Sequence, residues 1–265
     1  MVPYLDIMAH AAIETIRISV PTIIEAALGE VSSKNCDERL DSWSRSLLQE
    51  AAIHLDVKGR EHIVLGEAYI VMSNHQSHYD IPVLFQALRI PMRMVAKKEV
   101  FRIPIMAGAM RAAGFVEIDR QNQQSALNTL LSACNRLSES TSVWIAPEGT
   151  RTRTGHLGPF KPGGFRMAIH SLARILPVTI DGTMRTLPAG GLKVRRGNMV
   201  TVTIGAPIDP ASYGLERVRE LIGCVRETIG RHLTVAQSPK VIPGEKSEGY
   251  IRVPDFAGIV QERQY

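Results

Sequence analysis

Cysteine is scarce in this sequence, and the few cysteines follow no pattern. Cys36, Cys134 and Cys224 are odd in number and lie far apart in the chain. They form no CxxC pair, so their spacing indicates neither a disulfide framework nor a zinc site. Because structural disulfides belong to oxidising compartments, the sequence favours a reduced, cytoplasmic setting. We therefore predict no disulfide and no metal site.

Long apolar runs are lacking as well. No stretch of roughly 18 uncharged apolar residues occurs, so the sequence predicts no transmembrane helix. The N-terminus does not resemble a signal peptide, because Asp6, His10, Glu14 and Arg17 interrupt any apolar segment there. Any contact with a membrane is therefore expected to be peripheral.

The charge balance is only mildly positive. The chain has 265 residues, of which 45% are hydrophobic and 22% charged, and a formal net charge of +5. This composition excludes wholesale disorder and allows a sizeable core. Between Arg93 and Arg166, eleven Lys and Arg residues occur with only five Asp and Glu residues. The excess favours phosphates, acidic carrier proteins or anionic lipid surfaces as partners, and we expect no nucleic-acid partner.

The chain divides into three regions by sequence texture. A helix is expected over 4–28, with a break at Pro21, and a second over 37–56, with Asp37 as its cap. These helices either cover the core or dock on a membrane surface. The three predicted regions are an N-terminal helical region (1–56), an α/β domain (57–234) and an extended or disordered tail (235–265).

Strand-like and helix-like segments alternate after residue 57. The expected strands are 62–65, 69–73, 92–96, 115–118, 142–146, 175–180, 192–195 and 199–204. The expected helices are 80–89, 104–113, 121–140, 162–171 and 212–231. This alternation predicts an α/β fold with a mixed, mostly parallel central sheet flanked by helices, and an N-terminal helical element.

The stretch NHQSHYD, residues 74–80, follows one predicted strand directly. Ligands of α/β sheets gather beyond the carboxyl ends of strands. Residues five apart on a continuous helix lie about 140° apart, so His75 and Asp80 meet only if a loop turns between them. If Asp80 is an N-cap, one of its oxygens takes a backbone N–H and the other holds Nδ1–H of His75. His75 would then present Nε2 as a general base.

Two further stretches gather groups suited to an anion. PEGTR, residues 147–151, ends a predicted strand, and Gly149 allows the backbone to approach a ligand closely. Arg151 offers a planar fork of donors that suits a phosphate, and Lys161 follows in a glycine-rich loop. Arg120 ends the stretch GFVEIDR at another strand end. Taken alone, each stretch is also typical of a solvated turn.

Together, these blocks resemble the glycerolipid acyltransferase family over about residues 55–210. The resemblance rests on the order and spacing of NHxxxxD (74–80), GxxxxDR ending at Arg120, PEGTR (147–151) and LPV (176–178). Two positions depart from the usual family pattern, Ala146 where many members carry Phe and Thr152 where many carry Ser. These departures affect the expected acceptor preference and leave the expected chemistry unchanged.

The resemblance implies roles for individual residues. His75 would be the general base and Asp80 its partner. The acceptor and its phosphate would be bound by Asn74 of the first block, Arg120 of the second, and Glu148, Gly149, Thr150 and Arg151 of the third. Lys161 is a further candidate, inferred only from its basic, glycine-rich loop. Pro177, in the fourth block, would shape the site or its acyl-donor side. The resemblance also implies no cofactor. Many relatives carry a hydrophobic N-terminal anchor, whereas this region is only amphipathic here, so we expect the enzyme to be peripheral on the inner face of the membrane.

The implied reaction moves an acyl group from acyl-CoA or acyl carrier protein to the free hydroxyl of a lysophospholipid, above all 1-acyl-glycerol-3-phosphate. Three alternatives stay open. The acceptor could be another amphiphile, such as a lyso-ornithine lipid. The protein could be a hydrolase with Ser77 as nucleophile, although it has no GxSxG elbow. It could also be a lipid-binding protein without enzymatic activity.

Overall fold

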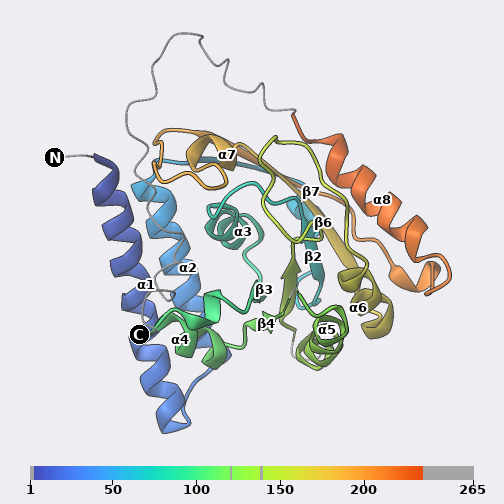
Figure 1. Cartoon of the computed structure of the whole chain (residues 1–265), viewed down its shortest axis with the longest axis horizontal. Helices are drawn as coiled ribbons and strands as arrows, with labels where there is room; N and C mark the ends of the chain where they lie inside the picture. The colour runs from blue at the N-terminus through green and yellow to red at the C-terminus, as the bar shows by residue number, and fades with distance from the viewer. Residues whose placement is uncertain (1–2, 120, 138–139, 235–265) are drawn as a thin grey trace, which may run out of the picture.

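A seven-stranded sheet forms the centre of the molecule (Figure 1). The computed structural model describes residues 3–119, 121–137 and 140–234. The strand order is β1-β7-β6-β2-β5-β3-β4, and every neighbouring pair is parallel except β6 and β7. The predicted mixed, mostly parallel sheet is therefore confirmed. The strands are β1 (His54–Lys58), β2 (Ile70–Ser73), β3 (Met92–Lys97), β4 (Val116–Ile118), β5 (Ser142–Ile145), β6 (Ile175–Asp181) and β7 (Met199–Ile204).

Helices cover both faces of this sheet. One face carries α3, with α1, α2 and α4 packed around it, and the opposite face carries α5, α6 and α8 (Figure 1). Each face therefore has its own apolar core, as expected for a sheet that is buried on both sides. The helices are α1 (Pro3–Leu28), α2 (Ser33–Glu50), α3 (Asp80–Leu88), α4 (Met106–Ala112), α5 (Gln123–Leu137), α6 (Gly163–Ser171), α7 (Thr183–Thr186) and α8 (Val218–Arg231).

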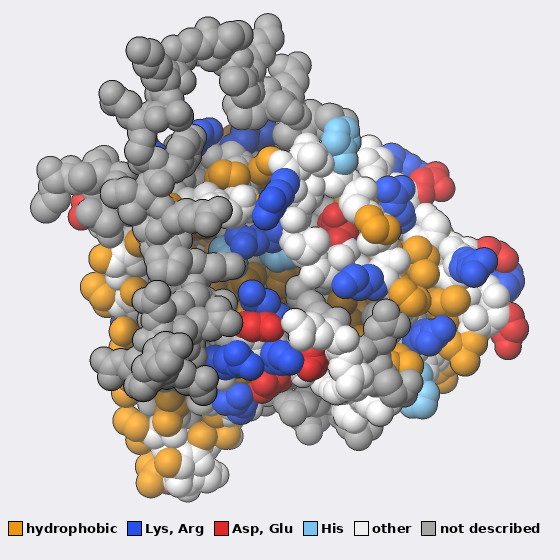
Figure 2. All heavy atoms as spheres, viewed as in Figure 1, with side chains coloured by type: hydrophobic (Ala, Val, Ile, Leu, Met, Phe, Trp, Pro, Cys, Tyr) orange, Lys and Arg blue, Asp and Glu red, His pale blue; other side chains and the backbone are white. Residues whose placement is uncertain are grey.

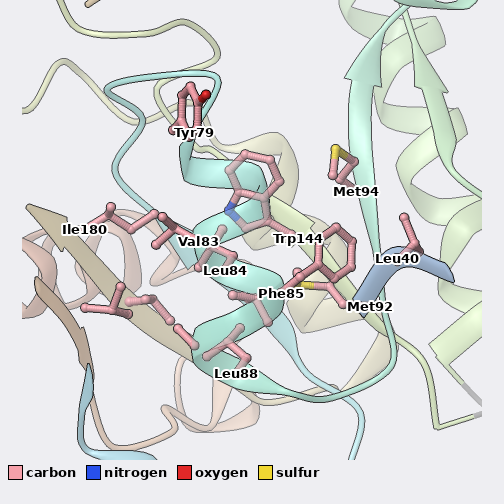
Figure 3. Close-up of a cluster of buried hydrophobic side chains, with 14 of the residues drawn as sticks. Leu40, Tyr79, Val83, Leu84, Phe85, Leu88, Met92, Met94, Trp144 and Ile180 are labelled. Carbon is pink, nitrogen blue, oxygen red and sulfur yellow. The ribbon is translucent and has the colours of Figure 1, made fainter. Parts of the chain in front are cut away.

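Helix α3 is the best-buried helix next to the site described below. Val83, Leu84 and Ala87 have no exposed surface, because α3 lies between the sheet and α2. Figure 3 shows side chains of α3 packed with Trp144 of β5 and with Met92 and Met94 of β3. Close packing of this kind limits the movement of the helix and of the loop that leads into it.

The N-terminal helices differ in detail from the prediction. α1 continues through Pro21 without the predicted break, because its packing against α2 and α4 offsets the cost of one lost hydrogen bond. α2 begins at Ser33 after the N-cap Ser32, whose side chain accepts the N–H of Asn35. Asp37, the predicted cap, instead pairs with Arg93 at 2.5 Å.

The predicted boundary at residues 56 and 57 lies inside β1. This strand was not expected, because its first three residues, 54–56, were predicted as the end of a helix. Two predicted strands were wrong: 62–65 follows a short 3-10 turn, and 192–195 is irregular. The division into regions otherwise stays a prediction, and the tail from residue 235 lies outside the described residues.

Candidate active site

The loop 74–79 lies at the carboxyl edge of the sheet, between the end of β2 and the start of α3. The strands β5 and β6 run parallel to β2 on either side of it, so their ends meet the same edge. Residues after β5 and β6 can therefore reach the loop, although they are far from it in the sequence.

His75 and Asp80 form the predicted pair. His75 Nδ1 lies 2.7 Å from Asp80 Oδ2, and the side chains are 15% and 0% exposed, respectively. A hydrogen bond at this distance, with Nδ1–H as the donor, leaves Nε2 as the proton acceptor of the ring. This arrangement can remove a proton from a hydroxyl group placed at Nε2.

The carboxylate of Asp80 acts differently from the prediction. Tyr79 is the N-cap of α3, and Asp80 is the first residue of the helix. Oδ2 accepts the N–H groups of Gln76 and Ser77, at 2.6 and 2.9 Å, as well as His75 Nδ1. The other oxygen, Oδ1, accepts a hydrogen bond from the hydroxyl of Thr183. The single carboxylate of Asp80 therefore both orders the loop and orients the imidazole of His75.

Trp144 of β5 packs against the His75 ring. The two ring centroids are 5.6 Å apart with an interplanar angle of 85°, an edge-to-face contact. Trp144 is held in turn, because its Nε1–H donates to Ser73 Oγ at 2.9 Å. The sequence placed Trp144 in a strand, but no local pattern showed that it would contact the histidine.

Asn74 points into the sheet. Its Nδ2 donates to the carbonyl of Ile180 and its Oδ1 accepts the N–H of Ile180, both at 2.8 Å. The side chain is 1% exposed, so both ends of the amide are used by β6. The sequence predicted that Asn74 binds substrate, and its geometry is instead that of an anchor between the loop and β6.

Glu148 joins this loop to the glycine-rich loop that follows β5. Its Oε1 accepts the N–H of His75 at 3.1 Å, and its Oε2 accepts the N–H of Gly158 at 2.8 Å. Thr152 N–H adds a bond of 2.8 Å to the carbonyl of His75. Burial raises the pKa of the Glu148 carboxyl, and the two backbone N–H groups oppose that rise. Glu148 was predicted to bind the acceptor, but both of its oxygens are occupied by backbone.

Replacing Glu148 with Ala should loosen both loops. Two part-buried backbone N–H groups would lose their acceptor, at a cost of up to about 1–3 kcal/mol each. We expect a lower free energy of unfolding in urea together with lower catalytic activity. Glu30→Gln, at an exposed position, is the matched control and should change neither. A Glu148→Ala variant with the wild-type free energy of unfolding would show that Glu148 does not hold the two loops together.

The chain is similar to a family of known proteins. A family model described as Acyltransferase matches residues 54–181. A 1-acyl-sn-glycerol-3-phosphate acyltransferase of Salmonella typhimurium is 30% identical over 183 residues, which cover 69% of this chain and 73% of that protein. The corresponding enzyme of Escherichia coli is 31% identical with the same coverage.

The chain belongs to the acyltransferase family. Its fold also resembles the crystal structure of the 1-acyl-sn-glycerophosphate acyltransferase of Thermotoga maritima, with a TM-score of 0.75 and 25% identity. That match covers 87% of this chain and 93% of the other. A chloroplastic relative from Brassica napus is 33% identical over 154 residues, and the chain spans less than half of its length, 44%.

The other predicted residues of the acyltransferase site lie in two places. One group follows β5 beside loop 74–79, which we call the dyad loop because it joins His75 to Asp80. This group is Gly149, Thr150, Arg151 and Lys161. Gly149 has φ of 73°, and a Cβ there would lie 3.0 Å from Lys161 Nζ, so glycine lets the lysine cross the turn. Thr150 and Lys161 are exposed and Arg151 is half-buried. Arg120 lies outside the described residues.

Pro177 lies on the other face of the sheet from the dyad. Its neighbours Leu176 and Val178 belong to the core beside α3, and alternation along β6 points Pro177 the opposite way. There it packs against Gly205, whose N–H donates to the Pro177 carbonyl at 2.8 Å. Any influence of Pro177 on the acyltransferase site is therefore indirect.

Ser77 is not placed as a nucleophile. It is fully buried, and its Oγ accepts the N–H of Tyr79 at 3.1 Å. Within residues 3–119, 121–137 and 140–234, no three His, Cys, Asp or Glu side chains gather in a way that could hold a metal ion. His75 and Asp80 therefore stay the predicted catalytic pair, with Nδ1 of the histidine on the carboxylate.

Proposed function

We propose that this acyltransferase transfers an acyl group from a thioester to the free hydroxyl of 1-acyl-glycerol-3-phosphate, which gives phosphatidic acid. The observation that carries the proposal is the His75–Asp80 pair at the carboxyl edge of the sheet, because a hydrogen bond from Nδ1–H to the carboxylate would leave Nε2 as the proton acceptor. Relatives at 30 and 31% identity that are named 1-acyl-sn-glycerol-3-phosphate acyltransferases support this acceptor.

The reaction needs two steps. In the first, His75 Nε2 takes the proton of the acceptor hydroxyl while its oxygen attacks the thioester carbonyl carbon, and Asp80 stabilises the imidazolium that forms. In the second, the tetrahedral intermediate collapses, the C–S bond breaks, and the imidazolium returns the proton to the leaving thiolate. The products are an ester and a free thiol, and the histidine regains its starting state. A general base of this kind contributes about 10²–10⁴-fold to the rate.

The acceptor's phosphate would be bound by basic side chains at the same edge of the sheet. Figure 2 shows Lys and Arg side chains gathered around a hollow on this face of the molecule. Arg151 and Lys161 are our candidates among the described residues, because they follow β5 next to the dyad loop. Arg120 keeps the same proposed role on the strength of its motif alone. Binding of the phosphate would hold the hydroxyl in position for attack.

The acyl donor is proposed to be acyl-CoA or acyl carrier protein, with no further cofactor. A different acceptor, such as a lyso-ornithine lipid, would use the same dyad, but it would leave the basic groups without a phosphate to bind. A screen tests these choices, with radiolabelled acyl-CoA and acyl carrier protein offered against a panel of lysolipids. Transfer to 1-acyl-glycerol-3-phosphate supports the proposal, and transfer only to acceptors without phosphate contradicts it.

We propose that the protein binds the inner face of the membrane peripherally, through α1. Asp6–Leu28 is long and apolar enough to cross a membrane, which the sequence analysis did not predict, but core helices and signal sequences share this length and composition. Several polar side chains of α1 are paired with α2, including Glu25 with Arg39 and His10 with Ser46. Its exposed side is mostly apolar, with Ile13, Ile16, Val20, Ile24 and Leu28, and it also carries the charged residues Asp6 and Arg17. A helix of this kind suits the plane of the interface.

Alkaline carbonate extraction of membranes distinguishes these two arrangements. A peripheral protein is released into the supernatant, whereas a membrane-spanning protein stays in the pellet. We expect release of the wild-type chain, and weaker binding to anionic vesicles when Ile16 and Ile24 are both replaced by Ser. Retention in the carbonate pellet would contradict peripheral attachment and favour insertion of α1 across the membrane.

A further inference from the structure

Two anchors attach the dyad loop to a segment that no motif includes. Asn74 is bonded to Ile180, near the end of β6, and Asp80 is bonded to Thr183, the first residue of α7. The residues 180–183 therefore hold the loop at both of its ends. The Thr183 side chain is fully buried, so water does not compete for its hydroxyl.

Thr183 supplies the hydrogen-bond donor to Oδ1 of the Asp80 carboxylate. Oδ2 of Asp80 has three donors, whereas the hydroxyl of Thr183 is the donor to Oδ1 among the described residues. Thr183 Oγ1 also lies 3.5 Å from Gln76 Oε1, but a hydroxyl has one hydrogen and the carboxylate oxygen is the nearer acceptor. Hydrogen-bond donors to both oxygens therefore fix the plane of the Asp80 carboxylate.

A glycine places Thr183 for this contact. Gly182 has φ of 114°, and a Cβ at this position would lie 2.4 Å from the carbonyl oxygen of Met199. The turn from β6 into α7 therefore requires glycine, and it aims Thr183 at the dyad across 103 positions of sequence.

We propose that Thr183 is a positioning residue of the acyltransferase reaction. Its hydroxyl orients the Asp80 carboxylate so that Oδ2 holds Nδ1–H of His75 and Nε2 stays the proton acceptor. The inference rests on the proposed function only for its kinetic consequences, because the hydrogen bonds do not depend on the substrate. Without the hydroxyl, the carboxylate can rotate and the ring loses its preferred tautomer.

The test compares Thr183→Val with Thr183→Ser and with Thr186→Val. Valine keeps the shape of threonine without the hydroxyl, and serine restores it. Thr186 is the matched control, because it lies on the same helix and is equally buried, and its hydroxyl has no hydrogen-bond partner in the part of the chain that the structure describes. We expect Thr183→Val to lower kcat by about tenfold or more with KM nearly unchanged, and the other two variants to resemble wild type.

A double-mutant cycle separates positioning from general damage. If Thr183 acts through Asp80, adding Thr183→Val to Asp80→Asn should change kcat by less than about twofold. An equal loss in both backgrounds, an equal loss in Thr186→Val, or wild-type kcat in Thr183→Val would overturn the proposal.

A second readout needs no substrate. Nitrogen-15 spectra of the His75 ring should show the Nδ1–H tautomer in wild type and in Thr183→Ser, and a mixture of tautomers in Thr183→Val. An unchanged tautomer in Thr183→Val would overturn the positioning role. Failure of the wild-type protein to transfer acyl groups would instead count against the proposed function, so the two failures are distinguishable.

Discussion

Replacing His75 with Ala should lower kcat by about 10²–10⁴-fold, because the acceptor hydroxyl then loses the base that takes its proton. The KM for the acceptor should change little, since no contact with the phosphate is removed. The measurement is the rate of acyl transfer by the purified variant under saturating donor and acceptor.

His78→Ala is the matched control for this variant. His78 lies three residues away in the same loop, but its side chain is exposed and Asp80 is bonded to His75. We expect His78→Ala to transfer acyl groups at close to the wild-type rate. Near wild-type activity in His75→Ala, or an equal loss in His78→Ala, would remove His75 from the role of base.

Asp80→Asn should produce a loss of similar size, about 10²–10⁴-fold in kcat. An asparagine oxygen at the position of Oδ2 can still accept from His75, Gln76 and Ser77, and its NH₂ can face the Thr183 hydroxyl. The loop should therefore keep its shape while the negative charge beside the imidazolium is lost. The kinetics are measured together with thermal unfolding.

Asp80→Ala separates the structural part of this loss from the chemical part. Alanine removes the acceptor of His75 Nδ1 and leaves the buried backbone N–H groups of Gln76 and Ser77 without a partner, which costs about 1–3 kcal/mol each. We expect Asp80→Ala to lower both stability and kcat, and Asp80→Asn to lower chiefly kcat. A fully active Asp80→Asn would mean that the carboxylate holds the loop and plays no part in the chemistry.

The His75–Asp80 pair could be predicted because the residues that indicate it lie close together in the sequence. His75 and Asp80 are five residues apart, they follow a predicted strand, and a polar loop separates them. The alternation of strands and helices likewise predicted the mixed, mostly parallel sheet. The match to the acyltransferase family then confirmed the family that the ordered motifs resembled.

The supporting contacts could not be predicted, because they join residues that are far apart in the sequence. Thr183 reaches Asp80 across 103 positions, and Trp144 reaches His75 only because β5 pairs with β2. The same limit explains why Asn74 and Glu148 were read as ligands of the substrate. A buried polar residue in a motif has to be satisfied, and its partner can be backbone as well as substrate. β1 was missed because its first three residues were predicted as the end of the preceding helix.

The most direct test of the account is thiol release by the purified wild-type protein from acyl-CoA, measured with and without 1-acyl-glycerol-3-phosphate. The products are identified by mass. The account predicts that thiol appears only when the acceptor is present, with one phosphatidic acid formed for each thiol released. Equal release of thiol without the acceptor, or with no phosphatidic acid formed, would contradict it.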